Sequence, residues 1–269
     1  MNSMNRRSKR SEPSQASPPR SSSQSPKKVR LDVLLVERGL AESRHRAQAM
    51  LLAGHIRLNG QPATKPGTLA ALDANIEISG EPLRYSSRGG LKLEGALEDF
   101  QLSPADKTCL DVGSSTGGFT DCLLQHGARR VHAVDVNTRQ LDWKLQRDPR
   151  VVRTEANARG LSRDSLAEQV DFVTLDVSFI SVSKILAALF PLANPGAEFL
   201  ILVKPQFELD RRSVGKRGIV RDPALHQRAI DSVKSAAAAA GLEVLGVKPS
   251  RITGAEGNAE FFLHARRSG

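Results

Sequence analysis

A glycine-rich segment and a later carboxylate have the residue types of a nucleotide site. The segment from Asp111 to Gly118 reads Asp-Val-Gly-Ser-Ser-Thr-Gly-Gly and lies between an apolar run and a helical pattern. Such a turn lets a ligand approach the backbone, and amides at a helix start favour an anionic group. Asp135 ends the next apolar run, where a carboxylate can accept both hydroxyls of an adenosine ribose. The pattern predicts an adenosine-type cofactor site; the alternative is a tight strand-to-helix turn that binds no ligand.

The spacing of the glycines distinguishes between two adenosine cofactors. Dinucleotide sites place their glycines as G-x-G-x-x-G, whereas here Ser115 holds the third position and the glycines stand at 113, 117 and 118. S-adenosylmethionine has no pyrophosphate to bind, and its ammonium group would meet Asp111 at the end of the first strand. We therefore predict S-adenosylmethionine as the cofactor. The predicted binding residues are Asp111, Gly113, Ser115, Gly117, Gly118, Asp135 and Asp176.

Four charged residues could carry out a methyl transfer to a ribose 2′-hydroxyl. They stand at the ends of predicted strands or on the helix before the first strand: Lys92, Asp176, Lys204 and Glu260. Ligands of open parallel sheets bind outside the carboxyl ends of the strands, so we expect these side chains to converge there. The alternative for each one alone is an ordinary charge at the end of a strand.

The 2′-hydroxyl must lose its proton as the methyl group arrives. A lysine can accept that proton only when its pKa, ordinarily about 10.4, is lowered by burial or by a like charge. Lys204 is the predicted base, oriented by Asp176. Lys92, oriented by Glu260, is predicted to supply the like charge and to help hold the 2′-oxygen.

From residue 107 onward, strand-like apolar runs alternate with helical patterns. Strands are predicted at 108–112, 130–135, 150–154, 171–176, 198–203, 242–248 and 260–265. The main predicted helices are 119–126, 182–190 and 223–240, and a further helical pattern at 91–100 precedes the first strand. Strands joined by crossover helices indicate a doubly wound, mostly parallel sheet. The last two strands have no helix between them, so the seventh strand should run antiparallel beside the sixth.

The part of the chain before these strands divides by composition. A Ser-, Pro- and Arg-rich start with almost no apolar residues is typical of disorder. Two short helices and a small curled sheet follow, with Ser43 as a helix N-cap, Gly54 as a stop and Asn59-Gly60 as a hairpin turn. The predicted division is a disordered basic tail at 1–28, a small domain at 29–80, a linker at 81–90 and a large domain at 91–269.

Composition and charge exclude several classes of protein. The 269-residue chain carries a net charge of +10, and the first 30 residues contain eight basic residues and one acidic residue. A basic arm of this kind would strengthen nucleic-acid binding without sequence specificity; the alternative is an extension with no specific role. The sequence has no apolar run of spanning length, no signal peptide and only two cysteines, Cys109 and Cys122. It therefore predicts a cytoplasmic protein without a disulfide framework or metal site.

Longer motifs carry a resemblance to known families. Residues 30–67 resemble the S4-type RNA-binding domain through Ser43-Arg44, Gly54-His55-Ile56, Asn59-Gly60 and Lys65-Pro66-Gly67. Residues 85–265 resemble the FtsJ/RrmJ-like ribose methyltransferases through Ser87-Arg88-Gly89-Gly90-Leu91-Lys92, Leu175-Asp176-Val177-Ser178-Phe179, Val203-Lys204-Pro205-Gln206-Phe207-Glu208 and Gly257-Asn258-Ala259-Glu260. The order and combination of these motifs are similar to those of the TlyA family.

The resemblance implies an α/β, Rossmann-like class I methyltransferase domain behind a small α+β S4-like domain. It also implies methylation of cytidine 2′-hydroxyls in ribosomal RNA with S-adenosylmethionine. The Lys-Asp-Lys-Glu tetrad of that enzyme class would fall on Lys92, Asp176, Lys204 and Glu260. Members of the family have also been labelled haemolysins, a label that no spanning or strongly amphipathic segment of this sequence supports.

Basic residues of the small domain and linker are candidate RNA contacts. They are Arg44, Arg46, Arg57, Lys65 and Arg88. Guanidinium and ammonium groups bind phosphate oxygens and so position an RNA rather than read its bases. The predicted partner is therefore ribosomal RNA within a folded ribosomal subunit. The alternative for each residue is a solvated surface charge.

Two other functions compete with a ribose methyltransferase. One is a non-catalytic ribosome-binding assembly factor with a methyltransferase-like fold, which the complete set of four tetrad residues argues against. The other is a small-molecule methyltransferase or a dehydrogenase. The S4-like segment and the Gly-Ser-Ser-Thr-Gly-Gly loop argue against that reading.

Overall fold

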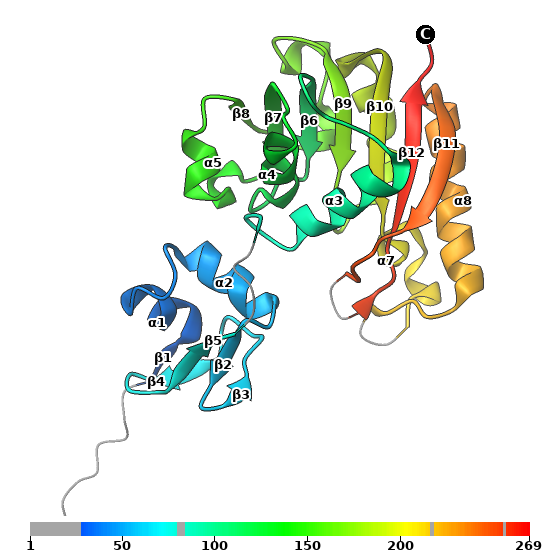
Figure 1. Cartoon of the computed structure of the whole chain (residues 1–269). Coiled ribbons are helices and arrows are strands. Elements are labelled where there is room, and N and C mark those ends of the chain that lie inside the picture. The colour runs from blue at the N-terminus through cyan, green and yellow to red at the C-terminus, as the bar shows by residue number, and fades with distance from the viewer. Residues whose placement is uncertain (1–27, 80–83, 216–217, 255–256) are drawn as a thin grey trace, which may run out of the picture.

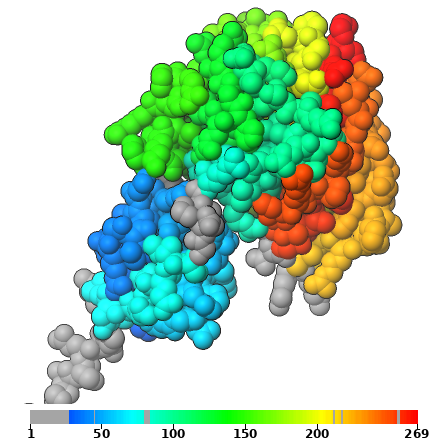
Figure 2. Space-filling model, in the orientation of Figure 1, coloured from blue at the N-terminus to red at the C-terminus, as the bar shows by residue number. Residues whose placement is uncertain are grey.

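The computed structural model describes residues 28–79, 84–215, 218–254 and 257–269 as a small N-terminal lobe and a larger lobe (Figure 1). The predicted tail, apart from Lys28, lies outside the described residues, as do residue 80 of the predicted small domain and residues 81–83 of the predicted linker. Figure 2 shows the small lobe, coloured blue to cyan, lying against one side of the larger lobe. No helix among the described residues is long and apolar enough to cross a membrane.

The larger lobe is built on a seven-stranded sheet in the order β11-β12-β10-β9-β6-β7-β8. The strands are β6 (Thr108–Val112), β7 (Arg130–Asp135), β8 (Val151–Glu155), β9 (Val170–Leu175), β10 (Ala193–Val203), β11 (Leu242–Pro249) and β12 (Phe261–Arg267). Strands β6 to β10 pair in parallel, and β12 runs antiparallel to both β10 and β11. The predicted mostly parallel sheet with an antiparallel last strand is confirmed. Strand β12 also inserts between β11 and β10.

Side chains of the central strands alternate between two apolar clusters. In β10, Phe199 and Ile201 pack in the cluster that includes residues of α6 and α8, whereas Leu200 and Leu202 pack in the cluster that includes residues of α3, α4 and α5. These helices are α3 (Gly89–Phe100), α4 (Gly118–Gln125), α5 (Trp143–Arg147), α6 (Leu186–Leu189) and α8 (Pro223–Ala239). Because successive residues of a strand face opposite sides, one apolar strand supplies both cores.

The single helix predicted for 182–190 is wrong. The segment forms a 3₁₀ turn at Val182–Lys184, the one-turn helix α6 and a second 3₁₀ turn at Phe190–Leu192. Pro191 lies in the last turn and has no amide hydrogen for an α-helical bond, so the helix cannot continue there. Short 3₁₀ turns also stand at Thr138–Gln140, Ala158–Gly160, Arg163–Ser165 and Arg211–Ser213.

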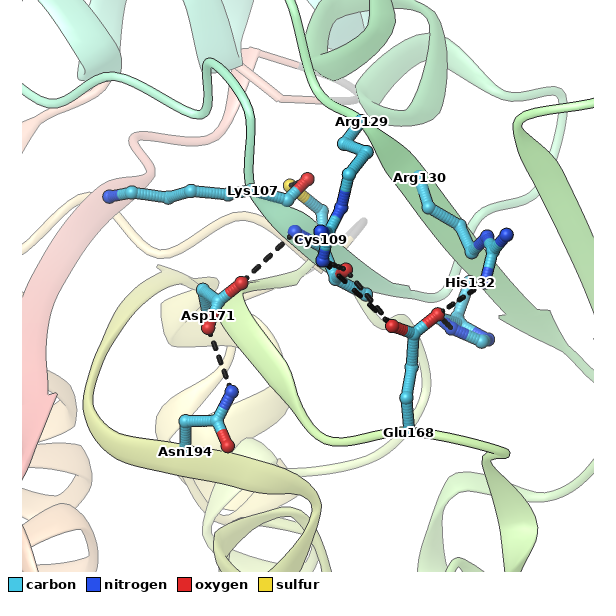
Figure 3. A network of polar contacts seen from close by, with 9 residues as sticks. Lys107, Cys109, Arg129, Arg130, His132, Glu168, Asp171 and Asn194 are labelled. Carbon is cyan, nitrogen blue, oxygen red and sulfur yellow. Dashed lines mark hydrogen bonds and ion pairs between the residues drawn. The ribbon is translucent and has the colours of Figure 1, made fainter.

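A polar network ties the amino-terminal edge of the sheet together (Figure 3). Arg130 Nη1 donates to Glu168 Oε1 at 2.6 Å, which holds the pKa of Glu168 below its usual range, and His132 Nε2 lies 3.6 Å from the same oxygen. Asp171 accepts a hydrogen bond from the Asn194 amide at 2.8 Å. These contacts join the starts of β7, β9 and β10. They fix the positions of these strands at the edge opposite the glycine-rich loop.

The small lobe has a core of its own and two small sheets. Strand β1 (Lys28–Arg30) pairs with β4 (Leu69–Ala71), and β2 (Ile56–Leu58) lies between β3 (Gln61–Pro62) and β5 (Ile76–Ile78). The helices are α1 (Leu31–Glu37) and α2 (Arg44–Leu52). The core of the lobe includes Leu31 and Leu35 of α1, Leu51 of α2 and Ile56 of β2. The predicted Asn59-Gly60 turn lies between β2 and β3, which pair antiparallel.

A buried carboxylate holds the two helices of the small lobe together. Asp32 on α1 is fully buried and accepts hydrogen bonds from Arg44 Nε at 2.9 Å and from the Gln48 amide at 2.8 Å. Arg30 also donates two hydrogen bonds to it, and this guanidinium is the main cause of an Asp32 pKa well below the usual range. Removing the partners of a buried carboxylate of this kind lowers the stability of the fold, because the charge is left without compensation.

Candidate active site

The glycine-rich loop leaves β6 through backbone conformations that a side chain would obstruct. Gly113 has φ +86°, and a Cβ there would lie 2.3 Å from the carbonyl oxygen of Asp176. The loop is held to the next strand by Asp135, whose Oδ2 accepts from the Ser115 amide at 3.0 Å and whose Oδ1 accepts from the Asn137 amide at 3.0 Å. Glycine at 113 is therefore required for the ends of β6 and β9 to lie side by side.

Two cavities adjoin this loop at the carboxyl edge of the sheet. The first, about 510 Å³, lies beside Lys92, Arg88 and Phe119, and the second, about 560 Å³, lies beside Asp135, Asn157 and Phe179. Both are lined by Gly113, Ser115 and Asp176. The shared lining makes them two parts of one groove, large enough together for a nucleoside with an amino-acid chain.

The geometry of this groove fits S-adenosylmethionine. Asp135 lines the second cavity, and the neighbouring Val136 is 68% exposed, so an apolar surface is open beside the carboxylate. Gly113, Ser114, Ser115 and Thr116 of the loop line the first cavity. The second cavity would hold the adenosine and the first the methionine chain. The cofactor itself would supply the electrophilic methyl group.

Asp111 does not reach this groove, which corrects its predicted contact with the cofactor ammonium. Its side chain is completely buried and accepts hydrogen bonds from Thr120 Oγ1 at 2.6 Å and Thr174 Oγ1 at 3.0 Å. Burial raises the pKa of Asp111 to about 6. The carboxylate joins β6 to α4 and β9.

Gly117 also has a different role from the predicted one. It has φ +94° and lines neither cavity, and a Cβ there would lie 2.2 Å from Leu145 Cδ1 of α5. Gly118 does line the first cavity, but a Cβ there would meet Ser87 Oγ at 2.2 Å. Both glycines therefore allow close packing of the loop against α5 and the start of α3, and only Gly118 remains a candidate cofactor contact.

Two lysine–carboxylate pairs lie at the carboxyl edge. Lys204 Nζ is 2.5 Å from Asp176 Oδ1, an ion pair without hydrogen-bond geometry, and donates to Ser178 Oγ at 3.0 Å. Lys92 Nζ donates to Glu260 Oε2 at 2.5 Å. All four charged side chains are at most 22% exposed. Such pairs are shielded from water and therefore hold fixed positions.

The topology explains how residues so far apart in sequence meet. Val203 and Phe261 are register partners in β10 and β12, so Lys204 after one strand and Glu260 before the other lie at the same edge. Lys92 on α3 and Asp176 after β9 line the same cavity. The antiparallel direction of β12 thus brings the fourth charged residue to this edge.

Two residues of this edge were missed by the sequence interpretation. Ser178 contacts Lys204, and a Cβ at Gly254 would lie 2.0 Å from Glu260 Oε1, so the backbone there packs directly on the carboxylate. Ser178 follows Asp176 by two residues within the quoted motif, and that proximity was the available signal. No sequence signal pointed to Gly254, because its contact with Glu260 is known only from the fold.

An exposed aromatic ring follows Ser178, the residue that accepts a hydrogen bond from Lys204. Phe179 is 93% exposed with φ +66°, and its ring centroid lies 5.3 Å from that of Phe207. Glu208 holds the loop that carries it, because its carboxylate accepts from Ser181 Oγ at 2.6 Å and from the Val182 amide at 2.9 Å. Exposing a large apolar ring in a conformation that side chains rarely adopt is costly, which points to a functional contact.

The predicted RNA contacts divide into two groups. Arg57 and Lys65 are exposed on the small lobe, and Arg44 is half exposed although it pairs with Asp32. Arg46 donates to the Tyr85 carbonyl at 3.1 Å and so joins the lobes, while Arg88 lines the first cavity. Ala49 and Leu52 of α2 line that cavity too. The small lobe is therefore part of the wall of the groove.

Comparison with known proteins identifies both lobes. The FtsJ-like methyltransferase family matches residues 85–267, and the S4 domain family matches residues 29–73. The Mycobacterium tuberculosis 16S/23S rRNA (cytidine-2′-O)-methyltransferase TlyA is 44% identical over 242 residues, which cover 89% of this chain and 90% of that protein. The chain belongs to the TlyA family.

Other members of the TlyA family and a solved structure agree with this assignment. Bacillus subtilis YqxC is 51% identical over 240 residues, 88% of this chain and 85% of its own length. A hemolysin-named protein from Streptococcus thermophilus has a solved structure that is 42% identical, with a TM-score of 0.72, covering 90% of this chain and 89% of that one. The TlyA family architecture, an S4 domain before an FtsJ-like methyltransferase, accounts for both lobes.

Proposed function

We propose that this chain transfers a methyl group from S-adenosylmethionine to the 2′-hydroxyl of a cytidine in ribosomal RNA. The observation that carries the proposal is the pair of buried lysine–carboxylate contacts, Lys204 with Asp176 and Lys92 with Glu260, at the edge of the cofactor groove. Methyltransfer to a hydroxyl needs a proton acceptor and a cation beside the oxygen, and this edge offers both.

Each charged residue has a part in the proposed reaction. Lys204, in its neutral form, accepts the 2′-hydroxyl proton at Nζ, and Asp176 and Ser178 fix the direction in which Nζ points. Lys92 stabilises the oxygen as it loses the proton, and Glu260 holds Lys92 in place. A lysine amine is a base only after it has lost its own proton.

Recognition of the RNA is assigned to the small lobe and to Phe179. Phosphate contacts from Arg57 and Lys65 would position the RNA, and the exposed Phe179 ring offers a face on which the base of the target nucleotide can stack. Stacking on an aromatic ring contributes about 1–3 kcal/mol per base. We place the reaction in the cytoplasm, where a ribosomal substrate is available.

The function is tested by transfer of a tritiated methyl group to purified ribosomal subunits and to naked ribosomal RNA. We expect incorporation at a cytidine 2′-oxygen, located by mapping 2′-O-methyl positions in RNA from cells with and without the gene. A protein that binds subunits but transfers no label to any RNA would be an assembly factor, and the methyltransferase assignment would be rejected.

A further inference from the structure

Three arginines on and near helix α5 have no carboxylate partner among the described residues. Arg139, Arg147 and Arg153 are exposed, and within the described ranges none of them forms an ion pair. The Gln146 side chain contacts two of these residues: its amide donates to the Arg139 backbone carbonyl at 3.3 Å, and its Oε1 accepts from Arg153 Nη1 at 3.2 Å. We call Arg139, Arg147 and Arg153, with the Trp143 ring, the α5 surface.

An aromatic ring lies against two cations of α5. The Arg147 guanidinium lies 5.2 Å and the Lys144 ammonium 5.6 Å from the centroid of Trp143, whose side chain is 41% exposed. A guanidinium against an aromatic face keeps its charge and its N–H donors available, whereas one paired with a carboxylate is neutralised. Asp148, directly after Arg147, does not cancel the Arg147 charge, because it is paired with Arg150. The arrangement suits a partner with many phosphates.

The α5 surface adjoins both the small lobe and the cofactor loop. The Trp143 indole donates to Glu42 of the small lobe at 3.3 Å, and Lys144 Nζ lies 3.2 Å from the same carboxylate. On its other side, Leu145 packs on Gly117 of the cofactor loop, and the Asp142 amide donates to the Thr116 carbonyl at 3.1 Å. An RNA held by the small lobe therefore has this basic surface next to it on the larger lobe.

We propose that the α5 surface binds the phosphate backbone of the RNA substrate next to the small lobe. The proposal rests on the proposed function, since it names a second contact with the same RNA. The three arginines of the α5 surface add affinity that does not depend on the RNA sequence, and they help set how the RNA enters the groove. Trp143 is the only tryptophan of the chain, so its fluorescence reports on this surface directly.

The test compares two double variants that each remove two positive charges. Arg139→Gln/Arg147→Gln removes charges of the α5 surface without breaking a side-chain hydrogen bond described above. Arg228→Gln/Lys234→Gln removes two charges from α8, which lies at the opposite end of the sheet from α5 (Figure 1). Binding to naked ribosomal RNA and to purified subunits is measured over a range of salt concentrations, and cofactor affinity is measured separately.

We expect the α5 variant to bind RNA several-fold more weakly and to show a salt slope shallower by up to about 1.8, because each duplex phosphate contact contributes about 0.9. The α8 variant should keep the wild-type slope, and both should keep cofactor affinity. Trp143 emission should change on RNA binding in the wild type and in the α8 variant.

Two outcomes would overturn the proposal. One is a wild-type salt slope and affinity in the α5 variant. The other is normal binding to naked RNA with weaker binding to subunits, which would assign the surface to a ribosomal protein. Failure of the proposed function is seen separately, as a wild-type protein that transfers no methyl group.

Discussion

The reactivity proposed for this protein depends on the side chain of Lys204. Replacing it with alanine removes the proton acceptor while leaving the glycine-rich loop unchanged, so turnover should fall by about 10²–10⁴-fold with cofactor affinity retained. Lys204→Arg should be no more active, because a guanidinium stays protonated near neutral pH. The measurement is single-turnover methyl transfer with RNA in excess. A near wild-type rate for the arginine variant would make Lys204 a positioning residue.

Asp135 is the residue whose change should affect cofactor binding most directly. Asp135→Ala removes the proposed ribose contact and also releases the Ser115 amide. A lost charged hydrogen bond costs about 1.5–3 kcal/mol, so cofactor affinity should fall roughly tenfold or more. Calorimetry with S-adenosylmethionine and with its demethylated product checks this. Equal affinities in variant and wild type would remove Asp135 from the site.

Asp111 gives the protein a stability that depends on pH in an unusual direction. Burial raises its pKa from 3.8 to about 6, so the folded state binds the proton more tightly than the unfolded state. This carboxyl therefore favours folding most at low pH, and its contribution declines as the pH rises from about 4 to 6. The stability of wild type relative to Asp111→Asn should fall by about 2–3 kcal/mol across that window. Denaturant unfolding of both proteins at pH 4 and at pH 7 measures this change; a constant difference between the two pH values would contradict it.

At the scale of elements, the loop after β9 depends on Glu208 of α7 (Pro205–Glu208). Burial raises the pKa of this carboxyl, and its two hydrogen bonds to Ser181 and Val182 hold the segment that carries Phe179. Glu208→Ala should lower kcat by about tenfold, because the ring and Ser178 lose their fixed positions. Glu208→Gln, which keeps one acceptor for the Val182 amide, should recover most of the activity.

The Glu208 prediction is checked by combining kinetics with amide hydrogen exchange. Exchange at residues 177–183 should rise in the alanine variant and not in the glutamine variant, while exchange in the amino-edge network around Glu168 stays unchanged. Equal loss of activity in both variants, with normal exchange, would assign Glu208 a role in the chemistry rather than in holding the loop.

At the scale of the whole molecule, RNA binding should combine the small lobe with the basic N-terminal tail. Deleting residues 1–27 removes six basic residues and one acidic residue, so binding to RNA should weaken and its salt dependence should flatten. Cofactor affinity should not change. Titrations of full-length and shortened protein at several salt concentrations measure this, and an unchanged salt slope would exclude the tail as a phosphate-binding arm.

The sequence alone determined the residue types, their order along the chain and the local elements. Strand and helix periodicity, the Gly-rich turn and the long motifs predicted the seven-stranded sheet and the family, because these signals depend on neighbours within a few residues. The same motifs contain Lys92, Asp176, Lys204 and Glu260, so the lysine and carboxylate residues could be named before their contacts were known.

Only the tertiary structure decided which side chains face the groove. Asp111 and Gly117 belong to the predicted loop. Asp111 is nevertheless buried and accepts hydrogen bonds from Thr120 and Thr174. Gly117 packs on Leu145, and all three partners come from other elements. The insertion of β12 beside β10 likewise sets where Glu260 lies. Burial and pairing depend on contacts between segments far apart in the chain, and a local pattern carries no information about them.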